Sequence, residues 1–579
     1  GDLVLVKAGL YEELVIMDKP VRLQAVGAYA TMINAIKFPS EKLLNWRNRI
    51  AALPDNYFLP GQEAGPIAGG PDNEPVLFGT EEGAGITVVA PATGPNGFNA
   101  NRPSRISGFW ITGGDDAGAI YVNGNARFLE ISNNRITSNA GVYGGGIRVG
   151  HPTLVVNDTD YVDANNQQID IHHNMVTQNG AMAGDGGGIA LYSGSHFYEV
   201  TDNFICGNIA QGNGGGIAHL GLSKNGRIER NTVVFNESFT QGRSVSGGGI
   251  FVGGAPGLTP NGLSEGSGIV TINANRIQGN VAGAGDGGGI RLQQVNGQDV
   301  AASPNDQTNW HFVFISNNFI VNNVTGLAGG GVSLQDALRV NMAHNTVANN
   351  DSTATAGEAF APGSPNASLS QPGAGLVARQ HSNELAAAIG PGAPSGFLLG
   401  FPNPFLRNNI FWHNRSFFWE TTTSGFRLVP DVGAGQSPIY DDLAVLPLSL
   451  GQLNPQYSLM TDPTGYHASN QTPPVEPFFV NEVVNGDRQA TVLQPEATTS
   501  IVPAPAFDEG GNFIDLNYGP LTLGDSDYHL DPTKLCGFGG CFAPAENGTP
   551  IGGVVYETDV DGQARPVGIG PDMGADELQ

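Results

Sequence analysis

The sequence is poor in basic residues, in charge of either sign and in long apolar runs. Among its 579 residues, 26 lysines and arginines face 53 aspartates and glutamates, so the formal net charge is −27, and only 14% of the residues are charged. The acidic balance argues against nucleic acids and anionic membranes as partners. No run reaches the roughly 18 apolar residues that suggest a transmembrane helix, so no membrane span is expected.

Cysteine is scarce as well, with three in the chain. Cys536 and Cys541 stand five positions apart in CGFGGC, and Cys206 stands alone. The glycines between the close pair would let it close a small disulfide loop, which fits an oxidising compartment, and two unrelated thiols are the alternative. A single close pair is a poor zinc site.

Glycine and proline, in contrast, are abundant, with 84 and 38 residues, which excludes a helical bundle and favours many turns. Three glycines in a row precede a β-branched residue six times. These stretches are Gly144–Ile147, Gly186–Ile189, Gly214–Ile217, Gly247–Ile250, Gly287–Ile290 and Gly329–Val332. Glycine in a strand interior costs stability, so its repetition indicates a recurring geometric need.

A second signal, N-x-[apolar]-x-x-N, precedes the glycine stretches. Its copies are Asn134–Asn139, Asn174–Asn179, Asn203–Asn208, Asn231–Asn236, Asn275–Asn280, Asn318–Asn323, Asn345–Asn350 and Asn409–Asn414. Apolar residues flank the first Asn of each copy, three positions before it and two after it. Short units repeat at 27 to 29 residues, as from Asn174 to Asn203. Each unit therefore reads as short strands separated by Asn or Gly turns.

A right-handed parallel β-helix, an all-β solenoid, fits this repeat best. Each unit would be one coil, stacked about 4.8 Å from the next, with equivalent apolar residues in interior files. One such file would hold Ile136, Val176 and Ile205. The first Asn of each copy would take a left-handed turn conformation and bond the Asn of the coils above and below. The predicted structural ladder is Asn134, Asn174, Asn203, Asn231, Asn275, Asn318 and Asn345. The glycine triplet would supply the positive φ for a sharp turn before each Ile or Val strand.

Both ends of the chain resemble known β-helix proteins. Residues 1–28, GDLVLVKAGLYEELVIMDKPVRLQAVGA, read as three short strands and resemble the opening coil of pectin-lyase-like proteins. SDYHLDP (Ser526–Pro532) and DVDGQARPVGIGPDMGADE (Asp559–Glu577) resemble the closing segment of bacterial secreted right-handed β-helix repeat proteins of the choice-of-anchor type. The family usually continues after YHLDP with a Ser-Pro-Ala-Ile-Asp-like stretch, which KLCGFGGC (Lys534–Cys541) replaces here. The resemblance implies a bacterial protein that is secreted or on the cell surface. It implies no single activity, because this fold hosts lyases, hydrolases, epimerases, adhesins and inert scaffolds.

The coils are interrupted at recurring places. Extra residues follow the glycine strand around Gly150–Gln167, Gly253–Ser267 and Gln293–Trp310, which predicts long loops on one wall of the solenoid. A longer insertion, Asp351–Pro404, is expected to leave after the Asn turn, near a neighbouring edge. A further insertion near 38–104 contains Ser40–Leu53, whose spacing predicts a helix with an N-cap at its start. We expect the β-helix to span 1–414, and 415–579 to form an irregular C-terminal extension packed on it.

Candidate catalytic residues are few. Asp116 and Asp185 precede glycine strands two coils apart, roughly 10 Å, near the upper limit for the carboxylate pair of an inverting glycosidase. Asp beside Gly is also the commonest turn pair, so a structural role is the alternative. The paired-Asp signature of polygalacturonase-like hydrolases and the Asp-Pro-His-Glu element of alginate epimerases are both missing from the sequence.

The loop NDTDYVDANN (Asn157–Asn166) is the best candidate for a cation site. Asp158, Asp160, Asp163 and Asn165 offer clustered oxygen ligands of the kind that Ca²⁺ prefers, although the loop lacks the central Gly and final Glu of an EF-hand.

Two functional classes follow from these features. The first is a non-catalytic extracellular scaffold, a surface, matrix or assembly component that binds glycan or protein through its loop wall and could self-assemble. The second is a polysaccharide lyase or hydrolase that uses the same wall on acidic glycans. Because the chain opens at Gly1 inside an expected strand, we also keep the hypothesis that it is one module of a larger secreted enzyme.

Overall fold

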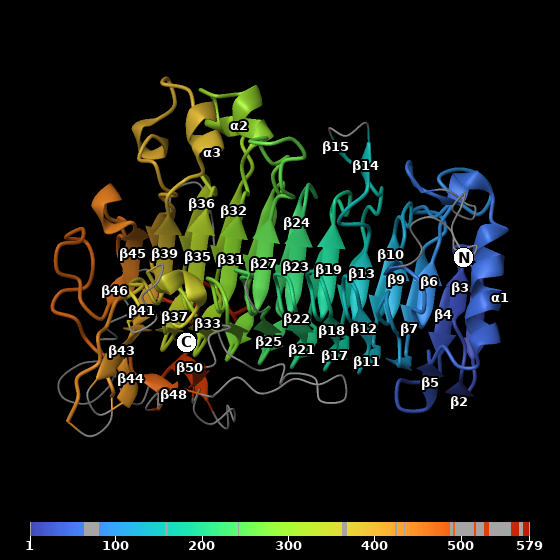
Figure 1. The fold of residues 1–579 in the computed structure, drawn as a ribbon, viewed down its shortest axis with the longest axis horizontal. Helices are drawn as coiled ribbons and strands as arrows, with labels where there is room; N and C mark the ends of the chain where they lie inside the picture. Colours follow the sequence, from blue (N-terminus) through green and yellow to red (C-terminus); the bar gives the residue numbers. More distant parts are fainter. Residues whose placement is uncertain are drawn as a thin grey trace. The chain divides into compact units, whose positions relative to one another are not determined.

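The computed structural model describes residues 2–62, 80–156, 160–240, 243–361, 367–422, 425–432, 435–486, 490–492, 514–516, 526–531, 557–566 and 571–577. Asp158, Cys536 and Cys541 lie outside these residues. The chain is almost entirely β, with parallel sheets of 8 to 12 strands (Figure 1). The predicted parallel β-solenoid is therefore confirmed, while its handedness stays a prediction.

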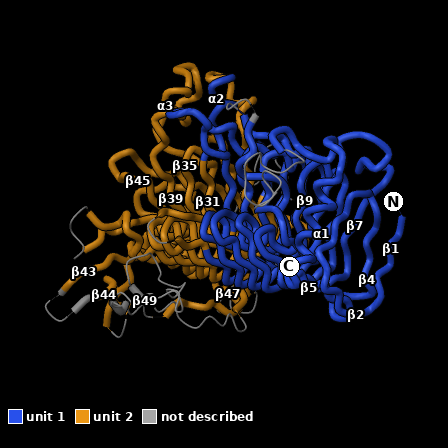
Figure 2. Tube along the Cα trace, turned by 45° about the vertical axis from the view of Figure 1, so that its right-hand side comes forward, with its two compact units in different colours: residues 1–237, 250–271, 294–302 blue, residues 238–249, 272–293, 303–579 orange. Residues whose placement is uncertain are grey.

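The chain divides into two compact units (Figure 2). Unit 1 comprises residues 1–237, 250–271 and 294–302, and unit 2 comprises residues 238–249, 272–293 and 303–579. The expected boundary near residue 414 falls inside unit 2. The division into 1–414 and 415–579 stays a prediction.

From β10 onward, one coil contributes a strand to each of four sheets, termed sheets 1 to 4 in the order in which such a coil visits them; the earlier coils contribute no strand to sheet 3. In unit 1, sheet 1 contains β1 (Leu3–Val6), β4 (Arg22–Ala25), β7 (Ser104–Ser107), β10 (Leu129–Ser132), β16 (Asp170–His172), β20 (Glu199–Thr201) and β24 (Gly226–Glu229). Sheet 2 contains β2 (Gly9–Tyr11), β5 (Thr31–Asn34), β8 (Trp110–Thr112), β11 (Arg135–Thr137), β17 (Met175–Thr177), β21 (Phe204–Cys206) and β25 (Thr232–Val234). Sheet 3 contains β12 (Ala140–Gly141), β18 (Gly180–Ala181) and β22 (Ile209–Ala210). Sheet 4 contains β3 (Val15–Met17), β6 (Ile86–Val88), β9 (Ile120–Val122), β13 (Ile147–Val149), β19 (Ile189–Tyr192), β23 (Ile217–Leu220) and β27 (Ile250–Gly253).

Unit 2 repeats the same arrangement. Its sheet 1 contains β32 (Val313–Ser316), β36 (Val340–Ala343) and β40 (Phe405–Arg407), and its sheet 2 contains β29 (Arg276–Gln278), β33 (Phe319–Val321), β37 (Thr346–Ala348), β41 (Ile410–Trp412) and β46 (Leu459–Met460). Its sheet 3 contains β30 (Val281–Ala282), β34 (Val324–Thr325), β38 (Asp351–Ser352) and β42 (Arg415–Ser416), and its sheet 4 contains β31 (Ile290–Gln293), β35 (Val332–Gln335), β39 (Leu376–Arg379) and β45 (Leu443–Leu446). Two strands, β26 (Glu237–Ser238) and β28 (Val270–Asn273), have residues in both units.

The interior of the coils is filled by apolar files in register. Ile136 pairs with Val176, and Val176 with Ile205, and all three side chains are fully buried. The predicted stacking of these residues is confirmed. Because each added coil buries the same inner positions, the core is a line of stacked residues, as in other solenoids.

The left-handed turn residue is not the Asn that was predicted but the residue directly before it. Asn133, His173, Asp202 and Arg230, which precede the first Asn of four coils, have φ between 53° and 56°. The turn at that position frees the following Asn to point its amide inward. The prediction of a left-handed Asn was therefore wrong by one position.

The glycine triplets meet two separate needs. The first glycine of a triplet is left-handed, as at Gly186, where φ is 75°. The second packs against neighbouring backbone: a Cβ on Gly187 would lie 2.5 Å from the carbonyl oxygens of Gly215 and Ile209. Side chains are thus excluded both by conformation and by close contact between coils.

The N-terminal segment and the long insertion differ in detail from expectation. Residues 1–28 contain four strands, not three, because Gly9–Tyr11 forms β2 between the turns. Asp351–Pro404 is not one insertion, because it contains the sheet 4 strand β39 and so divides into loops 353–375 and 380–404. The second of these loops follows a sheet 4 strand, like the three other predicted loops.

The helices all lie outside the sheets. The predicted helix is α1 (Ser40–Ala51), with Pro39 rather than a side-chain cap before it, and α2 (Gln298–Ala302) and α3 (Asn383–Ala388) lie in the loops after sheet 4. Short 3₁₀ turns are Asp55–Tyr57, Gln307–Asn309, Gly357–Ala359, Ser395–Phe397 and Leu448–Leu450. Among the described residues, no helix combines the length and apolar character needed to cross a membrane.

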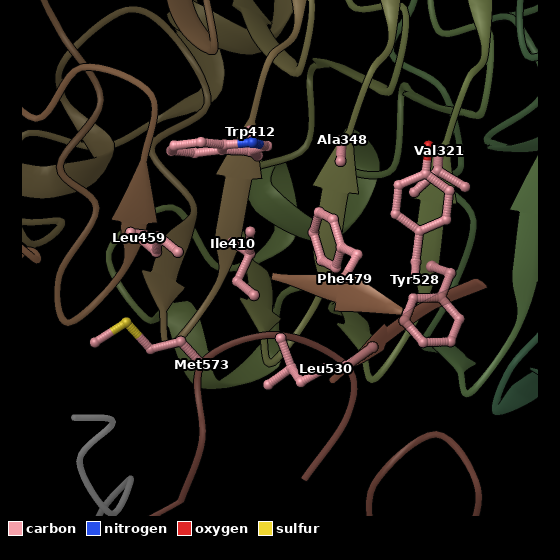
Figure 3. Packing of buried hydrophobic residues seen from close by; sticks show 11 residues of the cluster. Val321, Ala348, Ile410, Trp412, Leu459, Phe479, Tyr528, Leu530 and Met573 are labelled. Carbon is pink, nitrogen blue, oxygen red and sulfur yellow. The ribbon is translucent and has the colours of Figure 1, made fainter. Parts of the chain in front are cut away.

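The C-terminal residues of unit 2 cover the outer face of its sheet 2. β47 (Phe479–Asn481) pairs antiparallel with β50 (Asp527–Leu530), and their Phe479, Tyr528 and Leu530 share one buried apolar cluster with Ile410 and Trp412 of β41. Within this cluster, Tyr528 lies beside Val321 of β33 (Figure 3). Two further antiparallel pairs are β43 (Phe418–Thr422) with β44 (Gly425–Val429) and β48 (Ala490–Val492) with β49 (Ile514–Leu516).

Candidate functional site

The long loops follow sheet 4 strands and precede sheet 1 strands. In unit 1 they are residues 150–167, which include the hairpin β14 (Val155–Val156) and β15 (Asp160–Tyr161), residues 254–267, and residues 294–302. We term these three segments the unit 1 loop wall. Tyr161 donates its hydroxyl to the Pro256 carbonyl at 2.9 Å, and the Gln298 N–H donates to the Ser264 carbonyl at 2.8 Å. The neighbouring loops are therefore joined to one another.

Unit 2 joins its loops in the same way. The Gly390 N–H donates to the Pro304 carbonyl at 2.9 Å, and the Gly392 N–H donates to Asn305 Oδ1 at 2.8 Å. The rings of Trp310 and Phe397 meet edge to face, with centroids 5.2 Å apart.

The predicted cation ligands that the structure describes are engaged within the unit 1 loop wall. Asp163 Oδ1 accepts from the Asn165 N–H at 2.7 Å, and Asp163 Oδ2 lies 3.2 Å from His196 Nε2. Asn165 is left-handed, with φ of 52°, and its amide donates to the Asp163 carbonyl. Asp160 is exposed in β15. Asp163 and Asn165 thus form a tight turn, and the calcium site stays a prediction.

The two candidate catalytic aspartates lie beside sheet 4 strands two coils apart. Asp116 pairs with Lys37, and the Lys37 ammonium also lies 3.3 Å from Asp115. Asp185 is buried, and its Oδ1 accepts from the backbone N–H of Asn213 at 2.6 Å and from the Asn213 amide at 3.0 Å. Both carboxylates therefore hold the turns at which they stand.

A charged row on the outer face of sheet 1 in unit 1 escaped the sequence analysis. The register aligns Glu130 with Asp170, Asp170 with Glu199, and Glu199 with Arg227 on successive strands. We term the charged and histidine side chains on the outer face of these strands the charged face; its members are Arg105, Glu130, Asp170, His172, Glu199, Arg227 and Glu229. The alternation of charged and buried residues along each strand was a usable signal, but the columns appear only after the coils are aligned.

Ion pairs run along the charged face. Arg105 Nε donates to Glu130 Oε2 at 2.8 Å, and Arg227 Nη1 donates to Glu199 Oε1 at 3.1 Å. Burial opposes ionisation of Glu130, but hydrogen bonds from Ser132 and Arg105 outweigh it and hold the Glu130 pKa below its ordinary value. Asp170 differs, because partial burial, together with repulsion from Glu199 and Glu130, raises its pKa despite the nearby His172. The charged face thus combines carboxylates that are paired with arginine, such as Glu130, with Asp170, which has a raised pKa.

A corner of left-handed residues lies between the unit 1 loop wall and the charged face. Phe128, Gln168, Phe197 and Asn225 have φ between 56° and 59°. Phe197 is 47% exposed, which leaves an aromatic ring at the rim of the charged face.

Two buried polar clusters lie on the outer faces of sheet 4 strands, one in each unit. In unit 1, His151 lies 3.0 Å from Glu81 Oε1 and 2.7 Å from Asn123 Oδ1, and Arg148 Nη2 lies 3.2 Å from Glu81 Oε1. In unit 2, Asp286 binds Arg291 at 3.1 Å and also binds Arg379; these two arginines overcome burial and lower the Asp286 pKa. Each cluster pairs a buried carboxylate with at least one arginine, which suits anchoring of the segments that cover the sheet.

The predicted structural asparagines form ladders within each unit. In unit 1, each of Asn134, Asn174 and Asn203 donates its amide to Oδ1 of the next Asn at 3.0 Å, as far as Asn231. In unit 2, Asn275 donates to Asn318, Asn318 to Asn345, and Asn345 to Asn409, at 3.0 to 3.1 Å. The second Asn of each motif forms a parallel ladder, as from Asn139 to Asn179 and from Asn179 to Asn208.

A hollow of about 450 Å³ lies beside α1, lined by Lys37, Phe38, Ser40, Glu41, Leu43, Leu44 and Arg47. Its cations already have partners, since Lys37 pairs with Asp116 and Arg47 with Glu82 at 2.7 Å. The side chains of Lys37 and Arg47 are 24% and 22% exposed, whereas those of Glu199 and Arg227 are 45% and 49% exposed, so the charged face is the more accessible of the two.

The comparisons with known proteins leave the family open: no family model, no curated protein and no solved structure matches this chain.

Proposed function

We propose that the chain is a non-catalytic extracellular scaffold that binds a glycan along the charged face of unit 1, beside the unit 1 loop wall. One observation carries the proposal: Glu130, Asp170, Glu199 and Arg227 form a row of donors and acceptors, with exposed Phe197 at its rim. Carboxylate and guanidinium groups at successive strand spacings suit the many hydroxyl groups of a chain of sugars. An exposed aromatic ring provides the apolar face that sugar rings require.

Further support comes from the candidate catalytic aspartates. Asp185 accepts two hydrogen bonds from Asn213, and Asp116 pairs with Lys37, so neither is poised toward a substrate. The proposed extracellular setting rests on the acidic composition and on the resemblance of the end segments to secreted β-helix proteins.

Affinity electrophoresis and calorimetry against soluble neutral and acidic polysaccharides would test glycan binding. We expect saturable binding that weakens at least tenfold in Arg227→Ala and in Phe197→Ala. Arg49→Ala removes an exposed arginine from α1 and serves as the charge-matched control. Because the charged face carries more carboxylates than guanidinium groups, we expect neutral glycans to bind more tightly than acidic ones at low salt, and added salt to reduce that difference. No binding by the folded wild type, or equal losses in Arg49→Ala and Arg227→Ala, would rule out this face.

A second candidate function, glycan cleavage, is favoured by Asp170 alone. Its pKa is raised, and it lies one strand from Glu130 and one from Glu199. Neighbouring strands are about 4.8 Å apart, close to the separation of about 5 Å between the two carboxyl groups of retaining glycosidases. Asp170 would then be the proton donor, and Glu130 or Glu199 the nucleophile.

Product analysis after long incubation with bound polysaccharides separates the two functions. Under the scaffold proposal the polysaccharide length stays unchanged while binding persists. Cleavage by the wild type that disappears in Asp170→Asn, with binding retained, would replace the scaffold proposal with the enzymatic one.

A further inference from the structure

A mixed nitrogen and oxygen cluster joins two C-terminal segments of unit 2. His529 belongs to β50, whereas Asp561 and Asp576 belong to the closing segment, a name used here for the described residues 557–566 and 571–577. One ligand atom from each of the three residues lies within 4.8 Å of the other two. We propose that His529, Asp561 and Asp576 bind a divalent transition-metal ion such as Zn²⁺, which fastens the closing segment to β50.

The distances suit a small metal ion. His529 Nε2 lies 3.0 Å from Asp561 Oδ2. Zinc binds nitrogen and oxygen ligands at about 2.0–2.2 Å, which in a tetrahedral site places ligand atoms about 3.4 Å apart. Small side-chain rotations of the exposed Asp561 would therefore bring the three ligand atoms to coordination distance.

The surroundings of His529 resemble the outer shell of a metal site. Its other ring nitrogen, Nδ1, contacts the Asp527 carboxylate, and its ring packs edge to face on Phe319, with centroids 4.9 Å apart. A histidine that ligates a metal commonly donates its second N–H to a carboxylate, which orients the ring. Here that contact aims Nε2 toward Asp561 and Asp576.

The charge balance at this position also favours a cation. Asp527, Asp561 and Asp576 surround one imidazole, and one Asp576 oxygen is used by the Leu530 N–H at 2.8 Å. The other charged groups that face the cluster are Asp559, which repels Asp576, and Arg276, which attracts Asp527. The imidazole nitrogen selects Zn²⁺ or a similar transition metal over Ca²⁺, which takes oxygen ligands.

Metal binding at this cluster would act on the C-terminal packing of unit 2. β50 and the closing segment both cover sheet 2, where Leu530 and Met573 belong to the same apolar cluster as Ile410 (Figure 3). A metal ion held by both segments stabilises the folded state by mass action, since the ligands are not held together in the unfolded chain.

Zinc titration of the metal-free full chain, followed by calorimetry and thermal unfolding, tests the proposal. We expect saturable binding of one Zn²⁺ at this site and a rise in Tm that a chelator reverses. Asp561→Asn and His529→Gln should each lose that binding and that rise. Glu476→Gln, which removes another exposed carboxylate of unit 2, should behave as the wild type.

Cobalt substitution gives an independent readout. Co²⁺ bound by His529 in a tetrahedral site should produce visible absorption bands that Asp561→Asn weakens, although Asp561 is exposed and its loss leaves the core intact. The proposal is overturned if the wild type shows no saturable binding. It is also overturned if Asp561→Asn and His529→Gln retain the binding, which would assign the metal to other histidines of the chain.

Discussion

The buried asparagine amides show how single residues hold successive coils together. Asn203 donates to the Ile171 carbonyl, the Thr201 carbonyl and Asn231 Oδ1, at 2.8, 3.0 and 3.0 Å. Its own Oδ1 accepts from the backbone N–H and the amide of Asn174, both at 3.0 Å. This arrangement needs two N–H donors and an acceptor oxygen on one side chain, which explains why neither Asp, which has no donor, nor Ser, which has one, replaces Asn in these positions of unit 1.

Alanine substitutions at two glycines in unit 1 would distinguish the effect of steric contact on stability from the effect of backbone conformation. In Gly187→Ala the new Cβ would meet backbone oxygens at 2.5 Å, so we expect a loss of several kcal/mol in the free energy of unfolding. Gly207 is left-handed, with φ of 64°, but has open space around it, so Gly207→Ala should cost only about 1 kcal/mol. Chemical unfolding of both variants checks the difference, and equal losses would contradict the close-contact explanation.

Glu237, in β26, should make stability depend on pH. Burial raises the pKa of Glu237 from its ordinary 4.5 to about 7. The folded state therefore favours the protonated acid, and this contribution is complete below pH 4.5 and is lost as the pH rises through 7. Glu237→Gln should match the wild type near pH 4 and exceed it by about 1–3 kcal/mol at pH 8. Denaturant unfolding across this range checks the prediction; a difference that does not vary with pH would contradict it.

At the scale of elements, the outer face of one sheet has different partners along the chain. In unit 2, sheet 2 lies under β47, β50 and the closing segment, which bury Phe319, Ile410 and Trp412. In unit 1, residues on the outer face of sheet 2 are partly exposed, with Met175 at 38% and Phe204 at 40%. The repeat motif fixes only the inner residues of a strand, so the outer residues differ according to what covers them.

The hydroxyl of Tyr528 links β50 to the coils of unit 2 by hydrogen bonds, and its removal would measure their contribution to stability. Its buried hydroxyl lies 2.9 Å from both Asn322 Oδ1 and the Val483 carbonyl, and it accepts from the Asn349 amide at 3.1 Å. Tyr528→Phe should lower the stability of this region by about 1–2 kcal/mol, because partners of the hydroxyl stay buried.

Hydrogen exchange in β47 and β50 measures that loss. Tyr161→Phe, which removes a single hydroxyl contact from the partly buried loop wall of unit 1, is the matched control and should leave β50 unchanged. Unaltered exchange in Tyr528→Phe would show that apolar packing alone holds the strand.

For the whole molecule, features that repeat in every coil could be predicted from the sequence, whereas contacts that occur only once could not. The spacing of Asn134 and Ile136 recurs from coil to coil, and a glycine turn such as the one at Gly144 follows it in the same order, so the fold, the interior files and the glycine turns follow from one rule. Other contacts occur once and join residues that lie far apart in the sequence, such as the ion pairs of Asp286 with Arg379 and of His529 with Asp561. Such pairs depend on how individual loops pack. The Asp351–Pro404 error has a different origin. The turn before β39 reads Gly373-Ala374-Gly375, so it lacks the middle glycine of the triplet that marks most other sheet 4 strands.

Because the coils contact mainly their neighbours, damage to one coil should remain local. Asn203→Ala removes one step of the unit 1 ladder: the Asn174 amide loses its Asn203 acceptor and the Ile171 carbonyl loses its Asn203 donor, at a cost of roughly 1–3 kcal/mol in the free energy of unfolding. Hydrogen exchange should quicken most in β16, β17, β20, β21, β24 and β25, which form the mutated coil and the two coils beside it. The first coil, β1 to β3, should exchange as in the wild type. Glu199→Gln, a substitution on the exposed face of the same coil, should leave the interior protected. Equal loss of protection throughout unit 1 would show that its coils unfold as a single cooperative body rather than as linked neighbours.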